Sequence, residues 1–362
     1  MHRHVRQRSR KPTHWLLPAL LLATLARIAG AEALATPGNS TYTYYSVGEP
    51  AAMPASPARS ALLLLGGGEW PNDAIHAFIA AAGHGHIVVL RASGDDAAQQ
   101  DFWSSGGRPR AVSTLVFHDR AAAFDPNVAR LLASADGLFI AGGDQANYLR
   151  YWTGTPVQAA INDHVRAGKP LAGTSAGLAI LGHHAYGCLD GDSMDTPRAL
   201  ANPLRSGNTL VTGFLSLPGL EHVITDSHFA ERSRQGRLVA FMARLQHDAP
   251  TPDPDLVGLG IDEETGLWIE PNGDARVYSR KNGAVWWIHA AVPATPLVAG
   301  QPLGQSGIEL VRLGTDSRIR LPPNGTAGKA GAWQLENPLS RKRVDIVAGR
   351  WTSPPSDTMS AP

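Results

Sequence analysis

Cysteine is nearly absent from this chain of 362 residues, which contains Cys188 alone. A single thiol cannot form a disulfide within the chain, so the stability of the fold must come from packing. No histidine pattern near Cys188 marks it as a nucleophile, and we interpret it as a packed small residue. The sequence also lacks a His-Glu-x-x-His motif and a cysteine pair, so it predicts no metal site and no cofactor.

A hydrophobic run long enough to span a membrane is missing at the N-terminus. The apolar run "LLPALLLATLA" is too short for a comfortable span. It follows the basic segment "MHRHVRQRSRKPTHW" and precedes "AEALA", which ends at Ala35. This order is typical of a secretory signal, and an uncleaved anchor is the alternative. We expect residues 1–35 to be a signal peptide and the mature protein to be secreted or periplasmic, with no stable membrane association.

The small positive net charge of the chain belongs to this leader. Without residues 1–35 the count of Lys and Arg falls from 32 to 26 and that of Asp and Glu from 31 to 30, which gives a mature net charge of −4. A mildly acidic chain offers no electrostatic surface for nucleic acid or for an anionic membrane. Both are therefore excluded as expected partners.

Short apolar runs dominate the pattern after residues 36–60, a Pro-, Ser- and Thr-rich stretch that suits a linker or an extended arm. The runs are "ALLLLGGGEW", "HIVVLRASG", "STLVFHD" and "GLFIAGGDQ", with helical stretches such as "DAIHAFIAAAG" and "PVQAAINDHVRAG" between them. This alternation predicts an α/β fold with a mostly parallel sheet sandwiched by helices over residues 61–298. Active sites of such sheets lie at the carboxyl ends of the strands.

The pattern changes again after Leu256. Alternating residues separated by "PNGD" and "KNG" predict C-terminal antiparallel β hairpins, either extending the sheet or forming a small β layer. Residues 299–362 look irregular and are assigned to a C-terminal extension of unknown role. Trp333 and Trp351 in this extension are expected to pack against the main body. The chain shows no internal repeat and no long low-complexity segment.

The stretch "KPLAGTSAGLAIL" carries the clearest chemical motif. Gly173, Ser175 and Gly177 form a G-x-S-x-G pattern between an apolar run and a helix-forming one. Such a pattern is typical of a nucleophile elbow, a sharp turn that holds a hydroxyl at its tip and needs small neighbours. Backbone N–H groups at the helix start can also bind an oxyanion. A helix N-cap serine is the alternative.

A serine nucleophile needs a base, and the base needs an orienting acceptor. His228 follows the apolar run "HVIT" and precedes a long amphipathic helix, which is again a corner between a strand and a helix. Three acids at the end of another apolar run could orient it: Asp262, Glu263 and Glu264. The residues alone leave this choice open. Among the other histidines considered, His76, His84 and His86 are placed on helix or loop surfaces. We expect these three, together with His183 and His184, to be surface or packed residues.

Three arginines follow His228 closely. Arg232, Arg234 and Arg237 raise the local potential and favour bidentate binding of a carboxylate, and Glu231 neutralises part of this charge. The cluster therefore predicts a substrate with a free or side-chain carboxylate.

Four motifs in this order resemble those of the cyanophycinase family. They are "GGDQ" at residues 142–145, "GTSAG" at 173–177, "DSHF" followed by R-x-R-x-x-R over 226–237, and "GIDEET" at 260–265. The resemblance covers roughly Leu62 to His289. It implies a serine exopeptidase, related to the aspartyl dipeptidases, with a flavodoxin-like fold similar to the class I glutamine amidotransferases.

The resemblance also implies roles for individual residues. Ser175 would be the nucleophile, His228 the general base and Glu263 the acid. The substrate pocket would contain Gln145, Asp226, Arg232, Arg234 and Arg237. The Gly-rich turn "GGGEW" would contribute Gly67 and Gly68 to an oxyanion hole with Ala176. The order serine, histidine, acid differs from the serine, acid, histidine order of the α/β-hydrolases.

Cyanophycin, a poly-aspartate with arginine on each β-carboxyl, is the substrate that the resemblance implies, and β-aspartyl-arginine is the product. Members of the family typically carry "DQHF", whereas this chain has Ser227 in place of the glutamine. An aspartyl or isoaspartyl dipeptidase is therefore the alternative within the family, and a binding scaffold without turnover is the alternative outside it. Dimers occur in the family, so a homodimer is possible here.

Overall fold

The computed structural model describes residues 41–54, 56–191, 193–291, 294, 296–322 and 333–355. The expected signal peptide, residues 1–35, lies outside this range. Within the described residues, no helix combines the length and apolar character that a membrane crossing requires.

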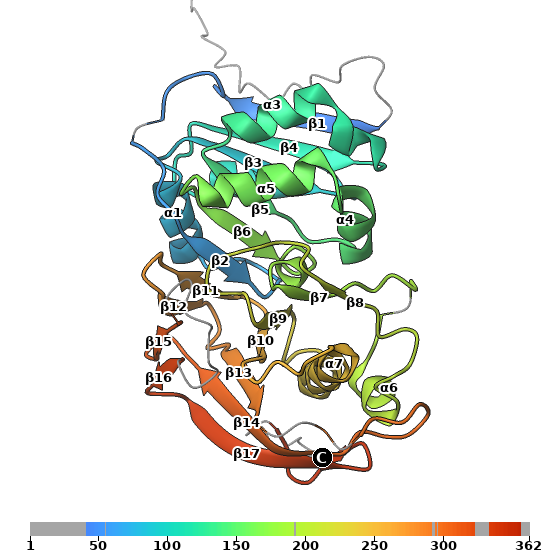
Figure 1. Cartoon of the computed structure of the whole chain (residues 1–362). Helices are drawn as coiled ribbons and strands as arrows, with labels where there is room; N and C mark the ends of the chain where they lie inside the picture. Colours follow the sequence, from blue (N-terminus) through green and yellow to red (C-terminus); the bar gives the residue numbers. More distant parts are fainter. Residues whose placement is uncertain are drawn as a thin grey trace, which may run out of the picture. The chain divides into compact units, whose positions relative to one another are not determined.

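The first of two sheets has ten strands in the order β1-β4-β3-β5-β6-β2-β11-β12-β15-β16 (Figure 1). Its parallel core consists of β4 (Ala111–Phe117), β3 (His86–Arg91), β5 (Gly137–Ile140), β6 (Leu171–Thr174) and β2 (Leu62–Leu65). The flanking antiparallel strands are β1 (Tyr42–Gly48), β11 (Thr265–Ile269), β12 (Asp274–Ser279), β15 (Arg318–Arg320) and β16 (Gln334–Glu336).

Helices cover both faces of the parallel core, because its strands are apolar on both sides. The helices here are α1 (Asn72–Ala81), α2 (Ala97–Ser104), α3 (Pro126–Ser134), α4 (Gln145–Trp152) and α5 (Pro156–Arg166), with the 3-10 turn η1 (Ala121–Phe124). Phe78 of α1 and Phe102 of α2 share a buried cluster with Leu63 and Phe139. Ile161 of α5 packs with the residues that point to the opposite face. The predicted sandwich of helices is confirmed for this part of the fold.

The second sheet has eight strands in the order β18-β17-β14-β13-β10-β9-β7-β8. Only β7, β9 and β10 are parallel neighbours in it. Its strands are β7 (His184–Tyr186), β8 (Leu210–Thr212), β9 (Val223–Asp226), β10 (Val257–Ile261), β13 (Val285–Ala290), β14 (Gln305–Leu313), β17 (Ser340–Val347) and β18 (Arg350–Trp351). The helices α6 (Thr196–Ala201) and α7 (Gln235–Asp248) pack on one another, and α7 also contacts β10. The prediction of one mostly parallel sheet is thus too simple, because parallel pairing is confined to the cores of two mixed sheets.

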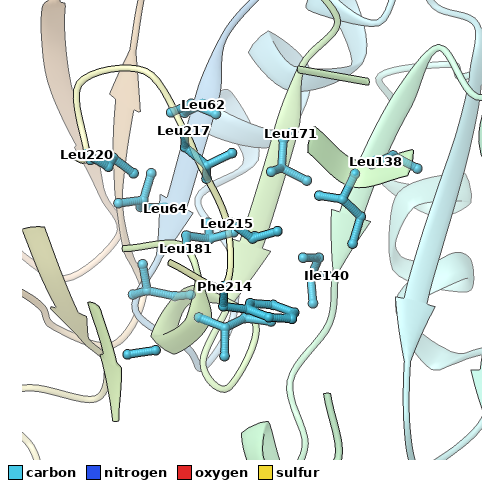
Figure 2. Packing of buried hydrophobic residues seen from close by; sticks show 14 of the residues in the cluster. Leu62, Leu64, Leu138, Ile140, Leu171, Leu181, Phe214, Leu215, Leu217 and Leu220 are labelled. Carbon is cyan, nitrogen blue, oxygen red and sulfur yellow. The ribbon is translucent and has the colours of Figure 1, made fainter. Parts of the chain in front are cut away.

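One buried cluster joins the two sheets. Figure 2 shows four apolar residues of the segment between β8 and β9 packed against strands of the first sheet; they are Phe214, Leu215, Leu217 and Leu220. The same cluster includes Leu64 of the first sheet and Leu259 of the second. Since burial of each large apolar side chain contributes on the order of 1.5–3 kcal/mol, this shared core fixes the sheets against one another.

The two turn motifs of the C-terminal half behave differently. The "PNGD" turn joins β11 to β12 in the expected hairpin. The "KNG" segment does not form a hairpin, because β12 pairs within the first sheet and β13 within the second. The chain also crosses between the sheets at 262–264, from β10 to β11. These acids therefore lie where the two sheets meet.

Residues 42–48 form strand β1, where the sequence predicted a linker or an extended arm. β1 pairs antiparallel with β4, and the Tyr44 and Ser46 hydroxyls hydrogen-bond with Ser113 across the pair. The side chains of this edge strand are half-buried or exposed. It consequently lacks the hydrophobic pattern on which the prediction relied.

The chain beyond Val298 is not irregular, as the sequence suggested, but contains β14 to β18. β14 pairs with β13 and β15 pairs with β12, so the extension continues both sheets. β17, "SRKRVDIV", has three consecutive charged residues near its start, so its first half lacks the apolar pattern of a strand. Trp333 and Trp351 pack against the buried clusters, as expected.

Candidate active site

Ser175 occupies a strained turn between β6 and the 3-10 turn η2 (Leu178–Ile180). Its φ of 54° lies in the left-handed region, which is costly for a residue other than glycine. The turn is possible because both flanking glycines are closely packed. A β-carbon on Gly173 would lie 2.8 Å from the Gly177 carbonyl, and one on Gly177 would lie 2.1 Å from the oxygen of Ile140. The predicted elbow is confirmed in its geometry.

His228 lies just beyond the carboxyl end of β9 and is held there by its backbone. Its φ is also in the left-handed region, at 46°, and its N–H donates to the Gly66 carbonyl at the end of β2. The next residue, Phe229, fits only because Gly260 has no side chain; a β-carbon there would lie 2.4 Å from the Phe229 ring. The histidine corner of the second sheet is thereby tied to the first sheet.

The three candidate acids have three different environments. Asp262 is buried and accepts hydrogen bonds from Ala230 N, Ala284 N and Trp286 Nε1, at 3.0, 2.8 and 2.9 Å. Burial raises the pKa of Asp262 to about 6. Glu264 forms ion pairs with Arg280 and Lys281. Of the three, Glu263 is the acid whose carboxylate is hydrogen-bonded to the imidazole.

A continuous chain of hydrogen bonds joins serine, histidine and glutamate. Ser175 Oγ lies 2.7 Å from His228 Nε2, and His228 Nδ1 lies 2.5 Å from Glu263 Oε1. A carboxylate can only accept, so Nδ1 carries the proton and Nε2 is left to accept from the hydroxyl. This is the tautomer that a general base requires.

The environment of His228 keeps its imidazole neutral. Burial is the main reason that its pKa is lowered, and the charges of Arg232 and Arg234 act in the same direction. Glu263 opposes them, through its hydrogen bond and its charge. The net pKa lies below the ordinary value for histidine, so a neutral base is available at neutral pH.

A hollow of about 260 Å³ opens in front of Ser175. Ala176 lines it, as predicted, but neither Gly67 nor Gly68 is among its lining residues. Gly67 packs instead against His228, since a β-carbon on it would lie 2.3 Å from the imidazole Cε1. Gly143, which the sequence analysis did not select, does line the hollow. Its only sequence signal was its place in "GGDQ".

The backbone N–H groups of Gly143 and Ala176 point to an anion-binding function. Within the described part of the chain, neither N–H donates to a protein acceptor. The turn that carries Gly143 also lies against the nucleophile, because a β-carbon on Gly142 would be 3.4 Å from Ser175 Cβ. Two free donors beside a serine hydroxyl can stabilise an oxyanion.

Two of the predicted substrate residues have free side chains in this hollow. Gln145 is the first residue of α4, and Arg232 is exposed on the corner after His228; both line the hollow. Neither side chain has a partner among the residues described here. Both are therefore available to a ligand, and Arg232 supplies the positive charge.

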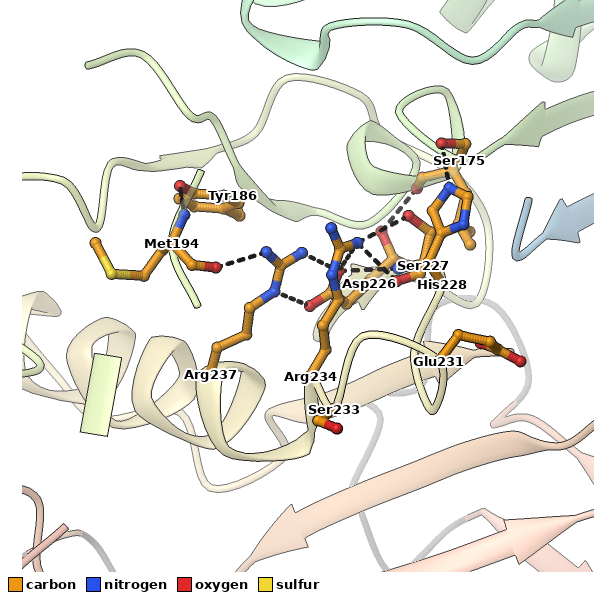
Figure 3. Close-up of polar contacts among 12 residues, drawn as sticks. Ser175, Tyr186, Met194, Asp226, Ser227, His228, Glu231, Ser233, Arg234 and Arg237 are labelled. Carbon is orange, nitrogen blue, oxygen red and sulfur yellow. Dashed lines mark hydrogen bonds and ion pairs between the residues drawn. The ribbon is translucent and has the colours of Figure 1, made fainter. Parts of the chain in front are cut away.

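The other three predicted substrate residues are bonded to one another (Figure 3). Arg237 donates from Nε and Nη2 to the two carboxylate oxygens of Asp226, at 2.7 and 2.6 Å. Arg234 donates to the Ser227 carbonyl at 2.7 Å and to Asp226 at 3.3 Å, and burial lowers its pKa to about 10. The side chain of Arg237 is 4% exposed. All three residues line the hollow, but the Arg237 guanidinium is already paired with the carboxylate of Asp226, whereas the sequence predicted that it would bind a substrate carboxylate.

Cys188 packs against a buried apolar cluster, as expected, and it is half-buried and lines the hollow. His86 is not on a helix or loop surface; it begins β3, is fully buried, and lies with Nε2 2.8 Å from Ser113 Oγ. Among the described residues there is no group of three His, Cys, Asp or Glu side chains suited to a metal ion.

Comparison with known proteins relates this chain to a family of peptidases. The model of peptidase family S51 matches residues 114–274. A cyanophycinase of Trichormus variabilis is 31% identical over 237 residues, 61% of this chain and 72% of that protein. A peptidase E of Shewanella denitrificans is 30% identical over 49% of this chain and 67% of its own length.

Solved structures give a weaker likeness. The structure of a peptidase from an acI-B1 Actinobacterium aligns with a TM-score of 0.48 at 20% identity, covering 73% of this chain and 97% of its own. The residues matched by the family model include Ser175, His228 and Glu263. The chain belongs to peptidase family S51 and is a serine peptidase.

Proposed function

We propose that this peptidase acts through a Ser175-His228-Glu263 triad and an acyl-enzyme intermediate. The observation that carries the proposal is the unbroken hydrogen-bonded chain from Ser175 Oγ through the imidazole to Glu263 Oε1. The free N–H groups of Gly143 and Ala176 support an oxyanion hole at the same place.

The reaction proceeds in two steps. Ser175 Oγ attacks the scissile carbonyl while its proton moves to His228 Nε2, and the oxyanion binds to the two N–H groups. The C–N bond then breaks, and Nε2 returns the proton to the leaving amine. In the second step His228 Nε2 removes a proton from water, which attacks the acyl carbonyl; the C–Oγ bond then breaks, and the imidazolium returns its proton to Ser175 Oγ. Glu263 holds the tautomer and stabilises the transient imidazolium.

The proposed substrate is an amide beside an aspartyl unit, with cyanophycin as the polymer and β-aspartyl-arginine as the product. The homologous cyanophycinases support this class. So does the unpaired Arg232, which can bind a substrate carboxylate in bidentate fashion. Ser227, where the family typically has glutamine, leaves a smaller dipeptide substrate as the alternative.

Purified protein separates the two substrates. We expect it to dissolve insoluble cyanophycin and to release β-aspartyl-arginine, which mass spectrometry detects. Turnover of aspartyl or isoaspartyl dipeptides without any dissolution of polymer would instead favour the dipeptidase. Failure to cleave either substrate, together with no phosphonate labelling, would favour a binding scaffold.

The triad is tested by substitution. Ser175→Ala is expected to lose on the order of three or more decades of kcat, and His228→Ala a similar amount. The double variant should lose no more than either single variant, because the two side chains act as a unit. Additive losses would contradict the proposed pair.

The proposal also includes the type of fold and the export of the protein. The parallel core with helices on both faces and a serine elbow after β6 supports a flavodoxin-like, class I glutamine amidotransferase-like fold. The N-terminal sequence supports secretion after removal of residues 1–35. N-terminal sequencing of the exported protein tests the latter; an intact leader on the exported protein would contradict it.

A further inference from the structure

Arg237 joins two walls of the hollow in front of Ser175. The first wall is the histidine corner, whose Asp226 receives two hydrogen bonds from Arg237. The second wall contains Cys188, Gly191 and Ser193, and Arg237 Nη1 donates to the carbonyl of the adjoining Met194 at 2.8 Å. Figure 3 shows the guanidinium between Asp226 and Met194. We call these three hydrogen bonds the Arg237 bridge.

Aromatic rings fix the guanidinium in this position. It lies over the ring of Tyr186 at 5.4 Å and over that of Phe241 at 5.8 Å, and the two rings stack on one another at 4.6 Å. Tyr186 also accepts the N–H of Met194 at 2.9 Å. The backbone of Met194 is therefore held on both sides, by the Tyr186 hydroxyl and by Arg237.

The bridge also contacts the segment that carries His228. Asp226 Oδ1 accepts the N–H of Ser227 at 2.9 Å as well as the hydrogen bonds of the two arginines, and His228 is the next residue. Without Arg237, Asp226 would be a buried carboxylate whose only cationic contact is the 3.3 Å hydrogen bond from Arg234. A buried charge that loses its partner forces its surroundings to rearrange. That rearrangement would occur two residues from the general base.

We propose that Arg237 is a positioning residue: it does not contact substrate, but sets the distance between the two walls of the hollow and thereby the placement of His228 and Arg234. This inference rests on the proposed triad. It assigns Arg237 a different task from that of Arg232, whose side chain is unpaired and exposed in the same hollow.

A small neutral reagent distinguishes positioning from substrate binding. Diisopropyl fluorophosphate phosphorylates an activated serine: the Oγ–P bond forms, the P–F bond breaks with loss of fluoride, and the proton moves to the histidine. The reagent has no carboxylate, so an arginine that only binds substrate would not affect its rate. Intact mass spectrometry measures the rate constant of labelling at Ser175.

We expect Arg237→Lys, which keeps the charge but not the bidentate geometry, to be labelled at least about tenfold more slowly than the wild type. For the peptide substrate, kcat should fall by a larger factor than KM rises. Asp226→Asn should behave similarly, and the double variant should be no slower than the slower single variant. Arg244→Lys on the same helix, whose guanidinium pairs with the exposed Asp248, is the control and should be labelled within twofold of the wild type.

Tyr186→Phe provides a second test if Arg237→Lys does not fold. It keeps the ring beneath the guanidinium and removes the hydroxyl that holds Met194 and also hydrogen-bonds with Cys188, so labelling should slow severalfold. Wild-type labelling in Arg237→Lys, or in Tyr186→Phe when that variant stands in for it, would overturn the inference. A wild type that is not labelled at all would overturn the proposed triad itself.

Discussion

At the scale of single residues, Gly67 shows how little space surrounds the imidazole of His228. The backbone of Gly67 has a φ of 109°, and an added β-carbon would lie 2.3 Å from His228 Cε1. Gly67→Ala should therefore displace the ring and lower kcat by about 100-fold, since a shift near 1 Å is enough for such a loss. Steady-state kinetics and a thermal melt of the same sample measure the two effects separately.

Gly154→Ala is the matched control for that variant. Gly154 also has a positive φ, 70°, but its nearest atom would be Arg120 Nη2 at 3.9 Å, outside the site. It should cost about 1 kcal/mol of stability from backbone strain and leave kcat unchanged. An equal loss of kcat in both variants would mean that strain, and not contact with the ring, is responsible.

Arg232 should influence the pH dependence of the enzyme. Its charge helps to lower the pKa of His228, in addition to the larger effect of burial. Arg232→Gln removes that charge, so the pKa rises and protonation inactivates the base at a higher pH. The acidic limb of kcat/KM against pH should consequently move to higher pH. A limb that stays in place or moves to lower pH would contradict this coupling.

The sequence predicted where the polar residues of the site lie better than it predicted what each side chain binds. Ser175 and His228 could be found because each follows an apolar run, at the edge where active sites of such sheets lie. Glu263 could not be separated from Asp262 and Glu264 by its residue type, because only the crossing between the sheets decides which carboxylate faces the ring. The pairing of Arg237 was also unpredictable, since its partners come from distant segments.

At the scale of elements, Asp262 fixes the crossing from β10 to β11. It accepts three hydrogen bonds, from the corner after His228 and from the start of β13. Asp262→Ala leaves two buried donors and one part-buried donor without an acceptor. The loss of stability should be about 3 kcal/mol, since the usual penalty is about 1–3 kcal/mol for each buried group. Urea unfolding measures this loss.

Trp286→Phe is a milder version of the same change. It removes one of the three donors and keeps an aromatic ring beside Arg312. Its cost should be about 1 kcal/mol, clearly below that of Asp262→Ala. Equal costs for the two variants would show that Asp262 stabilises the crossing through Trp286 alone.

Elements were predictable where burial imposes a pattern. The parallel strands read as continuous apolar runs, because both of their faces are covered. Strand β1 is only half-buried and β17 has a run of charged residues near its start, so neither reads as a continuous apolar run, and their pairing comes from neighbours far away in the chain. The "KNG" turn was misread for a similar reason, since local turn chemistry does not reveal which sheet the next strand joins.

At the scale of the whole molecule, buried histidines should make the fold sensitive to acid. Burial lowers the pKa of His86 and of His164 to about 4, from the ordinary value of 6.5. Between these values the unfolded chain binds more protons than the folded one. Stability is therefore expected to fall as the pH drops from about 6.5 to about 4, by at most about 3 kcal/mol for each histidine.

His164→Gln tests this pH dependence. His164 Nε2 lies 3.0 Å from the carbonyl of Pro170, and a glutamine amide can donate to the same oxygen without titrating. Urea midpoints between pH 7 and pH 4.5 should decline less steeply in the variant than in the wild type. Identical slopes would exclude His164 as a source of the acid sensitivity.

The residues of the proposed triad come from both sheets. Ser175 follows β6 of one sheet, His228 follows β9 of the other, and Glu263 lies on the strand-to-strand crossing that links the pair. Neither sheet alone carries all three side chains. If one sheet shifted against the other by the width of a single atom, turnover would stop although every strand and helix stayed intact. The catalytic rate should therefore respond to a misalignment of the sheets earlier than any spectroscopic signal of unfolding.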